Sequence, residues 1–299
     1  MTSTWQQQIK STSDPDLWNE LRHKLDKSLD PSIHQQGLIE QFYLPLFFYL
    51  HEQSRRKNQP GFIVGLNAPQ GGGKSTLSSY LVKMFEWSGL HAVTLSIDDF
   101  YLPRQDQVRL ASENPDNPYL QQRGYPGTHD IALGADILFH LKQFESDHTL
   151  SLPRYDKSKH NGQGDRAEPA LWSTVPLPVD VVLFEGWMLG FQTLPPDRIS
   201  DKHLQKINTL LKQYADWHSL LDCFVSLCPE DPVYVIDWRS EAEERMKARG
   251  LSGMSASEVR AYAEKFLPAY RLYSPHLSSH PPTPDAYLNI CIGKNRLPV

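Results

Sequence analysis

The sequence predicts an α/β fold in which helices flank a parallel β-sheet, preceded by a helical extension. Three observations predict it. From Gly61 onward, short apolar runs alternate with segments of helical periodicity, which is typical of parallel sheets wrapped by helices. A glycine-rich turn separates the first apolar run from the first of these helical segments. Two later apolar runs end in carboxylate residues, at strand ends where open α/β sheets bind their ligands.

Length and composition suit this fold. A chain of 299 residues allows one large or two modest domains and a sizeable core. We divide it into an N-terminal helical extension over residues 1–58 and a main domain over residues 59–299. The formal charge of −5 argues against a general nucleic-acid binder.

The chain also lacks the marks of a membrane or secreted protein. No apolar run approaches the roughly 18 residues of a membrane-spanning helix, and residues 1–10 lack the apolar core of a signal peptide. Cys223, Cys228 and Cys291 lack metal-site spacing and fit a reducing compartment. We therefore expect a cytoplasmic protein with neither a membrane nor a nucleic-acid partner. The oligomeric state stays open.

The N-terminal extension reads as two helical segments. Leu17, Leu21 and Leu25 recur at a spacing of four, and residues 37–53 carry a second set of apolar side chains. We expect these helices to pack on the outside of the main domain; a helical arm that binds a partner is the alternative. Residues 55–60 form the linker into the first strand.

Residues 61–77, GFIVGLNAPQGGGKSTL, have the order strand, loop, helix that a phosphate-binding loop requires. Glycines let backbone N–H groups wrap a polyphosphate at a helix N-terminus, where the helix dipole also favours anions. Lys74 can reach the β- and γ-phosphates, and the Ser75 hydroxyl can bind Mg²⁺. Against the pattern G-x-x-x-x-G-K-[ST], alanine replaces the first glycine. A glycine-rich turn without this role is the alternative. The predicted nucleotide-binding residues are Ala68, Pro69, Gln70, Gly71, Gly72, Gly73, Lys74, Ser75 and Thr76.

Carboxylates follow two of the predicted strands. Residues 91–97 (HAVTLSI) lead into Asp98 and Asp99, and residues 179–184 (VDVVLF) lead into Glu185. Carboxylates at these strand ends, next to the phosphate loop, are placed for Mg²⁺ or for proton abstraction. For the aspartate pair, a turn or a helix cap is the structural alternative.

Two polar stretches between the strands carry basic residues. Arg123 opens RGYPGTHD, where a fixed guanidinium can bind a carboxylate through two hydrogen bonds. Residues 150–166, LSLPRYDKSKHNGQGDR, read as a loop with Arg154, Lys157 and Arg166, suited to an anionic substrate. A solvated arginine and a solvated charged loop are the alternatives.

The C-terminal part continues the alternation. Residues 233–250 read as a long helix, and its Arg239, Arg245 and Arg249 could face the phosphates from a lid near residues 237–250 that excludes water. Ordinary helix ion pairs are the alternative. Residues 257–273 read as one further helix and residues 288–292 as the last strand. Asn295 and Arg296, after that strand, are candidates for contact with the nucleotide base.

Together, the phosphate loop and the carboxylates of both strand ends resemble the P-loop kinases of small metabolites grouped with phosphoribulokinase, uridine kinase and pantothenate kinase. Over roughly residues 60–299 the chain is similar to the D-glycerate 3-kinases of plants and cyanobacteria. The words that carry this resemblance are LSIDDFYL, RGYPGTHD, LPRYDKSKHNGQGDR, VVLFEGWMLGF and FLPAYRLY.

The resemblance implies a three-layer P-loop kinase fold, ATP and Mg²⁺ as cofactors, and phosphorylation of D-glycerate to 3-phosphoglycerate, a reaction of photorespiration. It assigns Asp98 as general base, since related kinases have D-S-F-Y or D-G-F there; Asp99 falls where those relatives have serine or glycine. It assigns Glu185 to the metal side and places Arg239 at the start of the lid helix. The expected catalytic residues are Asp98, Lys74 and Arg239, and the expected metal ligands are Ser75, Glu185 and Asp98.

The residues offer a parallel argument for a small hydroxy acid, because the carboxylate of glycerate needs a cation. Pantothenate would need a longer apolar pocket and a nucleoside an aromatic floor, and the nearby tyrosines and Trp187 keep both open. Kinases of pantothenate, uridine or a sugar phosphate, a nucleotide-dependent switch and a scaffold that lost catalysis are the alternatives. The expected substrate-binding residues are Asp99, Tyr101, Arg123, Arg154, Tyr155, Lys157 and Arg166.

Overall fold

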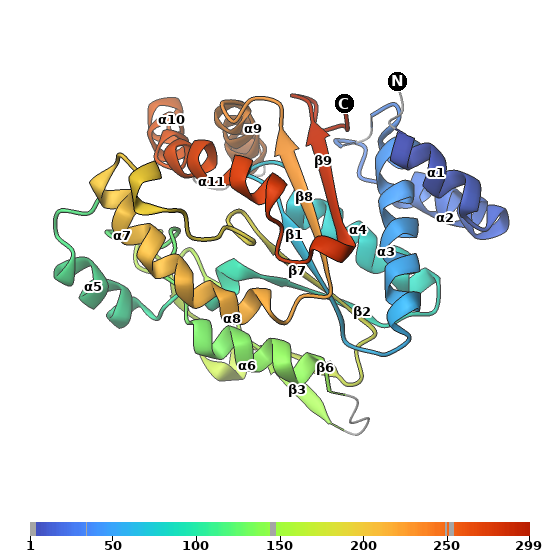
Figure 1. The fold of residues 1–299 in the computed structure, drawn as a ribbon, viewed down its shortest axis with the longest axis horizontal. Helices are drawn as coiled ribbons and strands as arrows, with labels where there is room; N and C mark the ends of the chain where they lie inside the picture. Colours follow the sequence, from blue (N-terminus) through green and yellow to red (C-terminus); the bar gives the residue numbers. More distant parts are fainter. Residues whose placement is uncertain (1–3, 34, 144–147, 249, 251–253) are drawn as a thin grey trace.

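The computed structural model describes residues 4–33, 35–143, 148–248, 250 and 254–299. Its centre is a parallel sheet of five strands in the order β2-β7-β1-β8-β9, with helices on both sides (Figure 1). This confirms the predicted α/β class. The strands are β1 (Phe62–Asn67), β2 (Ala92–Ser96), β7 (Val181–Gly186), β8 (Cys223–Pro229) and β9 (Tyr287–Ile292).

The pairing of the three strands β2, β7 and β1 positions the site. β1 and β7 are buried along their whole length, as apolar runs covered on both faces of a sheet should be. In register, Asn67 of β1 lies beside Gly186 of β7, and Ser96 of β2 lies beside Glu185. Because the strands are parallel, the chain that leaves each of them emerges at the same edge of the sheet.

Helices from the N-terminal part of the chain cover one side of the sheet, to the right in Figure 1. Phe47 of α3 contacts Phe85 of α4 with ring centroids 5.0 Å apart, and Trp18 of α2 stacks on Phe48 at 5.2 Å. The N-terminal helices therefore share the hydrophobic core of the main domain. They are α1 (Thr4–Thr12), α2 (Pro15–Ser28), a π-helical turn (Leu38–Tyr43), α3 (Leu44–Lys57) and α4 (Lys74–Trp87).

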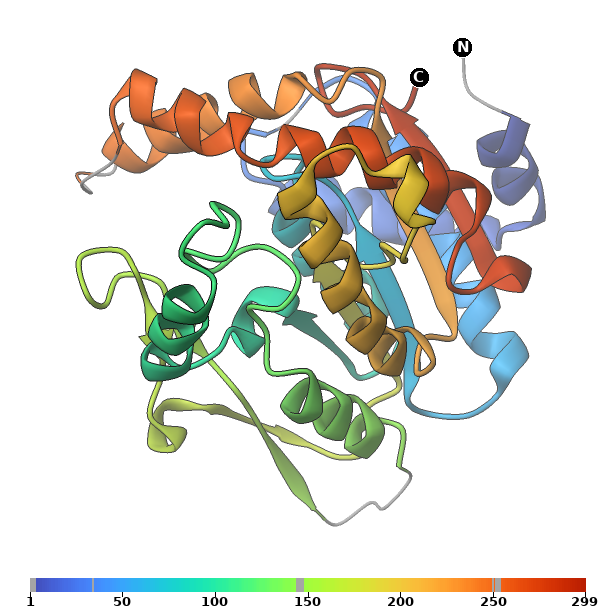
Figure 2. The same ribbon diagram turned by 60° about the vertical axis from the view of Figure 1, so that its left-hand side comes forward.

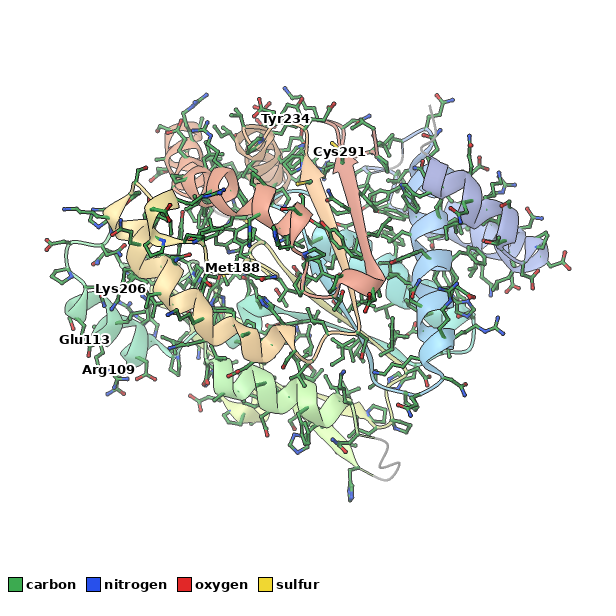
Figure 3. The ribbon with its side chains drawn as sticks, viewed as in Figure 1. Arg109, Glu113, Met188, Lys206, Tyr234 and Cys291 are labelled. Carbon is green, nitrogen blue, oxygen red and sulfur yellow. The ribbon has the colours of Figure 1, made fainter. Side chains whose placement is uncertain are left out.

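A second group of helices covers the opposite side, to the left in Figure 1. Trp217 of α8 fills this layer, fully buried against Phe100 and Phe184. Met188, after β7, is likewise buried, whereas Arg109 and Lys206 point outward (Figure 3). The helices of this side are α5 (Arg104–Glu113), α6 (Ile131–Leu141), α7 (Lys202–Leu210), α8 (Ala215–His218), α10 (Ala256–Glu264) and α11 (Leu267–Ser279).

Residues 150–166, predicted as a loop, are in part paired strands. β4 (Tyr155–Asp156) and β5 (Asp165–Arg166) form a short hairpin, which we call the basic hairpin. β3 (Thr149–Leu152) pairs with β6 (Ser173–Pro176) in a ribbon that projects from the lower edge in Figure 2. The loop prediction was wrong here because strands of two to four residues are too short to show a period of two.

The C-terminal helices sit above the basic hairpin in Figure 2. α9 (Tyr234–Ala248) confirms the predicted helix over residues 233–250, although Arg249 lies outside the described residues. The prediction of a single helix over residues 257–273 is wrong, because the structure has two helices there, α10 and α11, with an interruption between them. Pro268 stands in the first turn of α11, and because a proline lacks an N–H and its ring crowds the carbonyl four residues earlier, α10 cannot continue through this position.

Two further findings concern the described residues as a whole. None of the helices in the described ranges has the length and apolarity needed to cross a membrane. Cys223, Cys228 and Cys291 are free thiols.

Candidate active site

The phosphate loop lies where the sequence predicts it, between the end of β1 and the start of α4. Two of its glycines have left-handed backbone, with φ of 73° at Gly71 and 90° at Gly73. A Cβ at Gly71 would lie 2.7 Å from the Cβ of Trp238, so a side chain cannot fit there. Gly73 is the N-cap of α4, and the first turn of that helix therefore presents its backbone N–H groups to the loop.

Contacts from distant parts of the chain hold the loop. The Gln70 N–H donates to the hydroxyl of Tyr270 at 3.0 Å, and Arg296 Nε donates to the Gly71 carbonyl at 2.8 Å. The Trp238 indole donates to the Lys294 carbonyl at 2.7 Å, which ties α9 to the C-terminal turn. The loop is therefore supported by α11, α9 and the C-terminal turn, three segments that no loop pattern includes.

Lys74, Ser75 and Glu185 meet at the sheet edge. Lys74 Nζ donates to the Pro69 carbonyl at 3.1 Å, and Ser75 Oγ donates to Glu185 Oε1 at 3.1 Å. Burial raises the pKa of Glu185, and the Lys74 ammonium only partly opposes this. Burial also disfavours the charged form of Lys74 and lowers its pKa, although the nearby carboxylates of Glu185 and Asp98 act to raise it. These groups form one electrostatic cluster.

The two strand-end aspartates point to different partners. Asp98 forms a direct ion pair with Lys157 and a hydrogen bond with the Tyr101 hydroxyl. Burial raises the pKa of Asp98, but the Lys157 ammonium and the hydrogen bonds from Lys157 and Tyr101 together outweigh it, and the net pKa is lowered. Asp99 instead accepts the Tyr155 N–H at 3.4 Å and lies 3.8 Å from the Arg154 guanidinium. Asp98 thus belongs to the Lys74 cluster, and Asp99 anchors the basic hairpin.

The basic residues predicted for the substrate divide into two groups. Lys157 meets Asp98, and Arg154 lies largely exposed beside Asp99. Arg166 has another role: it is largely buried, pairs with Asp130 at 2.9 Å and donates to the Tyr101 carbonyl at 3.2 Å. Asp130 also caps α6, where its side chain accepts the Leu133 N–H. Arg166 thus supports the chain behind Tyr101.

Arg123, predicted as a fixed guanidinium that can bind a carboxylate, is held by backbone carbonyls. It donates to the Gly162 carbonyl at 2.9 Å and to the Gln163 carbonyl, and it lies over the Tyr155 ring at 5.5 Å. Carbonyl acceptors leave its positive charge uncompensated, so it still adds to the potential around Tyr155. Its main contact is with the tip of the basic hairpin.

Sequence reasoning missed the residues beneath Tyr101. His129 stacks on the Tyr101 ring at 4.5 Å, and its Nδ1 is 2.6 Å from the Tyr214 hydroxyl. That hydroxyl already accepts the Gly127 N–H, so its own proton is available to Nδ1. Burial lowers the pKa of His129 to about 3, which keeps the ring neutral. His129 is visible in the sequence stretch RGYPGTHD. A single histidine in a sequence, however, does not reveal whether it packs against another side chain or takes part in catalysis.

Arg239, expected to act from the lid, forms an ion pair within α9. Its guanidinium pairs with Glu243, which is 3 % exposed, and lies over the ring of Tyr262 in α10 at 5.4 Å. The other oxygen of Glu243 accepts the Met254 N–H at 3.2 Å. The charges of Arg239, Asp98 and Lys157 all act on Tyr262, so this part of α9 and α10 faces the side of the loop where Asp98 and Lys157 lie.

The oxygen groups at the loop fit a magnesium ion held together with a nucleotide. Mg²⁺ binds few protein carboxylates and completes its shell with water and phosphate oxygens. Ser75 and Glu185 offer such a hydroxyl and carboxylate 3.1 Å apart, with Asp98 in the same cluster. In the described part of the chain, no group of three or more histidine, cysteine or acidic residues could form an all-protein cage.

A cavity of about 440 Å³ opens on the other side of the loop. Backbone and side chains from Gly71 through Leu77 form one end of it. Its remaining walls come from α9, from the C-terminal turn that follows β9, and from the N-terminal extension. Figure 3 marks the start of α9 at Tyr234 and the end of β9 near Cys291, both at the upper edge of the molecule.

The chain is similar to known kinases over most of its length, although no protein-family model matches it. It is 37 % identical over 283 residues to the chloroplastic D-glycerate 3-kinase of Arabidopsis thaliana, covering 90 % of this chain and 62 % of that protein. An uncharacterized kinase of Schizosaccharomyces pombe is 36 % identical, over 84 % of this chain and 94 % of its own. The solved D-glycerate 3-kinase of Cryptococcus neoformans superposes with a TM-score of 0.79 and 34 % identity, over 86 % of this chain and 97 % of that one.

Proposed function

The chain belongs to the family of the D-glycerate 3-kinases, and from this premise we propose that it transfers the γ-phosphoryl group of ATP to the 3-hydroxyl of D-glycerate. The relatives that carry this name support the substrate. The chain spans 62 % of the length of the plant relative, and the Cryptococcus neoformans structure is matched over 97 % of its length. The product is 3-phosphoglycerate.

One observation carries the choice of acceptor: the ion pair between Asp98 and Lys157 beside the phosphate loop. A short hydroxy acid presents a carboxylate and a hydroxyl only a few atoms apart. A cation next to a carboxylate base complements both groups at that spacing, because the cation can bind the carboxylate and the base can accept the proton of the hydroxyl. Lys157 then binds the carboxylate of glycerate while Asp98 faces the hydroxyl. Arg154, exposed beside Asp99, adds positive charge nearby.

The chemistry is in-line phosphoryl transfer, which depends mainly on positioning and charge stabilisation. The loop N–H groups and Lys74 hold the phosphates of the nucleotide. Asp98 accepts the proton of the acceptor hydroxyl, and its lowered pKa keeps it ionised and ready to accept. Tyr101, held by Arg166 and His129, fixes the orientation of Asp98 through its hydroxyl.

Ser75, Glu185 and Asp98 would hold the magnesium ion, which when bound neutralises charge on the phosphates. The burial of Glu185 keeps its carboxylate poorly hydrated, which strengthens its attraction to cations such as Lys74. Arg239 is a further candidate for charge stabilisation from α9, if it exchanges Glu243 for phosphate oxygen when the nucleotide is bound.

A screen of ADP release tests the proposal. The purified protein is given ATP and Mg²⁺ with D-glycerate, L-glycerate, pantothenate, uridine or ribulose 5-phosphate, and the product is identified by mass. We expect release that depends on D-glycerate and yields 3-phosphoglycerate. Release with another acceptor would overturn the substrate, and ATP turnover that no acceptor stimulates would favour a nucleotide-dependent switch.

A further inference from the structure

The cavity beside the phosphate loop has one apolar wall, formed by the N-terminal extension. Ile33, Leu38, Phe42 and Tyr43 line it. Leu38, Phe42 and Tyr43 are each 4 % exposed, whereas Ile33 is partly exposed at the rim. The sequence alone suggested that the extension covers the outside of the main domain. The structure shows that it also lines this cavity. It reaches the edge of the sheet where the loop lies.

The backbone of this wall is a π-helical turn, Leu38–Tyr43, entered through Gly37 with a φ of 86°. The Leu44 N–H donates to the Ile39 carbonyl, the i+5 to i bond that defines such a turn. π-helical turns are rare and occur frequently at functional sites. Here the turn directs Leu38, Phe42 and Tyr43 into one cavity and then continues directly into α3.

The chemistry of the cavity changes from this wall to the loop. Arg245, Lys294 and Arg296 line it together with Lys74, the loop glycines and one carboxylate, Glu241, which pairs with Arg296 at 2.7 Å; Lys294 pairs with Asp237 at the same distance. At the rim, Gln35 Nε2 donates to the Asn295 carbonyl at 2.9 Å, which joins the extension to the C-terminal turn. A volume of about 440 Å³ lies in the range of small-molecule sites. An apolar wall at one end and cations with free N–H groups at the other match a nucleoside triphosphate.

We propose that Ile33 and the π-helical turn Leu38–Tyr43 form the base-binding wall of the nucleotide site, with purine as the class of base. The phosphates lie on the loop and α4, and the base lies against Ile33 and Phe42 beside the C-terminal turn. The proposal rests on the proposed function in taking ATP as the nucleotide. The N-terminal extension is then part of the active site.

The test compares ATP with inorganic tripolyphosphate, which shares the phosphates but has no base. Binding of both to the full chain, with Mg²⁺ and without acceptor, is measured by calorimetry for the wild type, Ile33→Ala and Phe42→Leu. We expect the Kd for ATP to rise about tenfold in each variant, the effect of losing one good apolar contact. The Kd for tripolyphosphate should stay within about twofold.

Leu17→Ala is the matched control, since Leu17 is a partly buried leucine of the same extension that does not line the cavity. It should leave both Kd values unchanged. Wild-type ATP affinity in Ile33→Ala and Phe42→Leu would overturn the proposal, and so would an equal loss of ATP and tripolyphosphate binding. Both outcomes are independent of the acceptor: a protein that binds ATP through this wall but does not phosphorylate glycerate refutes only the proposed substrate.

Discussion

The two sides of the phosphate loop are built in different ways. The acceptor side consists of charged and polar residues that pair with each other, among them Asp98 with Lys157 and Arg166 with Asp130. The nucleotide side combines the apolar wall of the π-helical turn Leu38–Tyr43 with charged residues of α9 and the C-terminal turn, where Arg296 pairs with Glu241 and Lys294 with Asp237. Lys74 stands between the two sides, at the start of α4.

This difference decides what a substitution does. On the acceptor side each residue has a specific partner, so a change of charge should act on turnover or on the acceptor KM. On the nucleotide side many weak contacts share the binding, so a change there should act on ATP affinity alone. Five predictions sharpen this comparison, beginning with the residue that serves both sides.

The largest effect is expected for Lys74→Ala. Lys74 contacts the loop carbonyl of Pro69 and shares a cluster with Glu185 and Asp98, so its loss removes charge stabilisation from the transferring phosphoryl group. We expect kcat/KM to fall by about a thousandfold or more. Steady-state kinetics measures it, and circular dichroism checks the fold. Lys83→Ala on the exposed face of the same helix is the control. Near-normal activity in folded Lys74→Ala would contradict the role of the loop.

Next in size is the split between the two aspartates. Asp98→Asn keeps the size of the side chain and removes the base, so kcat should fall by about a hundredfold or more while ATP still binds. Asp99→Asn weakens only the anchor of the basic hairpin at Tyr155 and Arg154 and should lower kcat much less. Kinetics and calorimetry on both variants give the answer. A dead Asp99→Asn enzyme with Asp98→Asn nearly intact would reverse the assignment.

Lys157→Ala should separate acceptor binding from nucleotide binding. Loss of its ammonium leaves the glycerate carboxylate without its cation, so the KM for glycerate should rise by about tenfold or more, and that for ATP by less than about twofold. Lys159→Ala, two residues along the same hairpin, is the matched control. Equal KM values for glycerate in the two variants would argue that the hairpin is a solvated surface.

Arg166→Ala should instead lower the stability of the fold, because Arg166 supports Tyr101 and Asp130.

The smallest effect concerns acid stability on the acceptor side. Burial lowers the pKa of His129 to about 3, while the unfolded chain binds a proton near pH 6.5. Stability is therefore fully present above about pH 6.5 and is lost as the pH falls toward the folded pKa, by about 1.4 kcal/mol per pH unit. Urea unfolding at pH 7.5 and 5.5 measures the loss. His129→Phe should reduce the difference between the two pH values by about 1.4 kcal/mol. An unchanged difference would show that folding leaves the pKa of His129 at its unfolded value.

Much of the acceptor side could be predicted because its residues lie in contiguous stretches. Asp98 and Glu185 directly follow apolar runs of the sequence, and parallel strands place their carboxyl ends at one edge, so their adjacency in space follows from the strand pattern. The loop of Gly71 to Lys74 follows from local backbone demands in the same way. The roles of Asp98, Glu185 and Lys74 in the reaction are predictions, which the substitutions above test.

The amino-acid sequence by itself was enough to predict the sheet, the phosphate loop and the strand-end carboxylates. Each depends on a local pattern: apolar runs, a cluster of glycines, and charges at strand ends. Only the tertiary structure decided which cation lies beside Asp98. Arg154, Lys157 and Arg166 look alike in the sequence, yet Arg166 lies under Tyr101 and Lys157 meets Asp98. Only the tertiary structure, too, brought Phe42, Trp238 and Arg296 around one cavity. Their meeting depends on packing between segments far apart in the chain, and no local period encodes that packing.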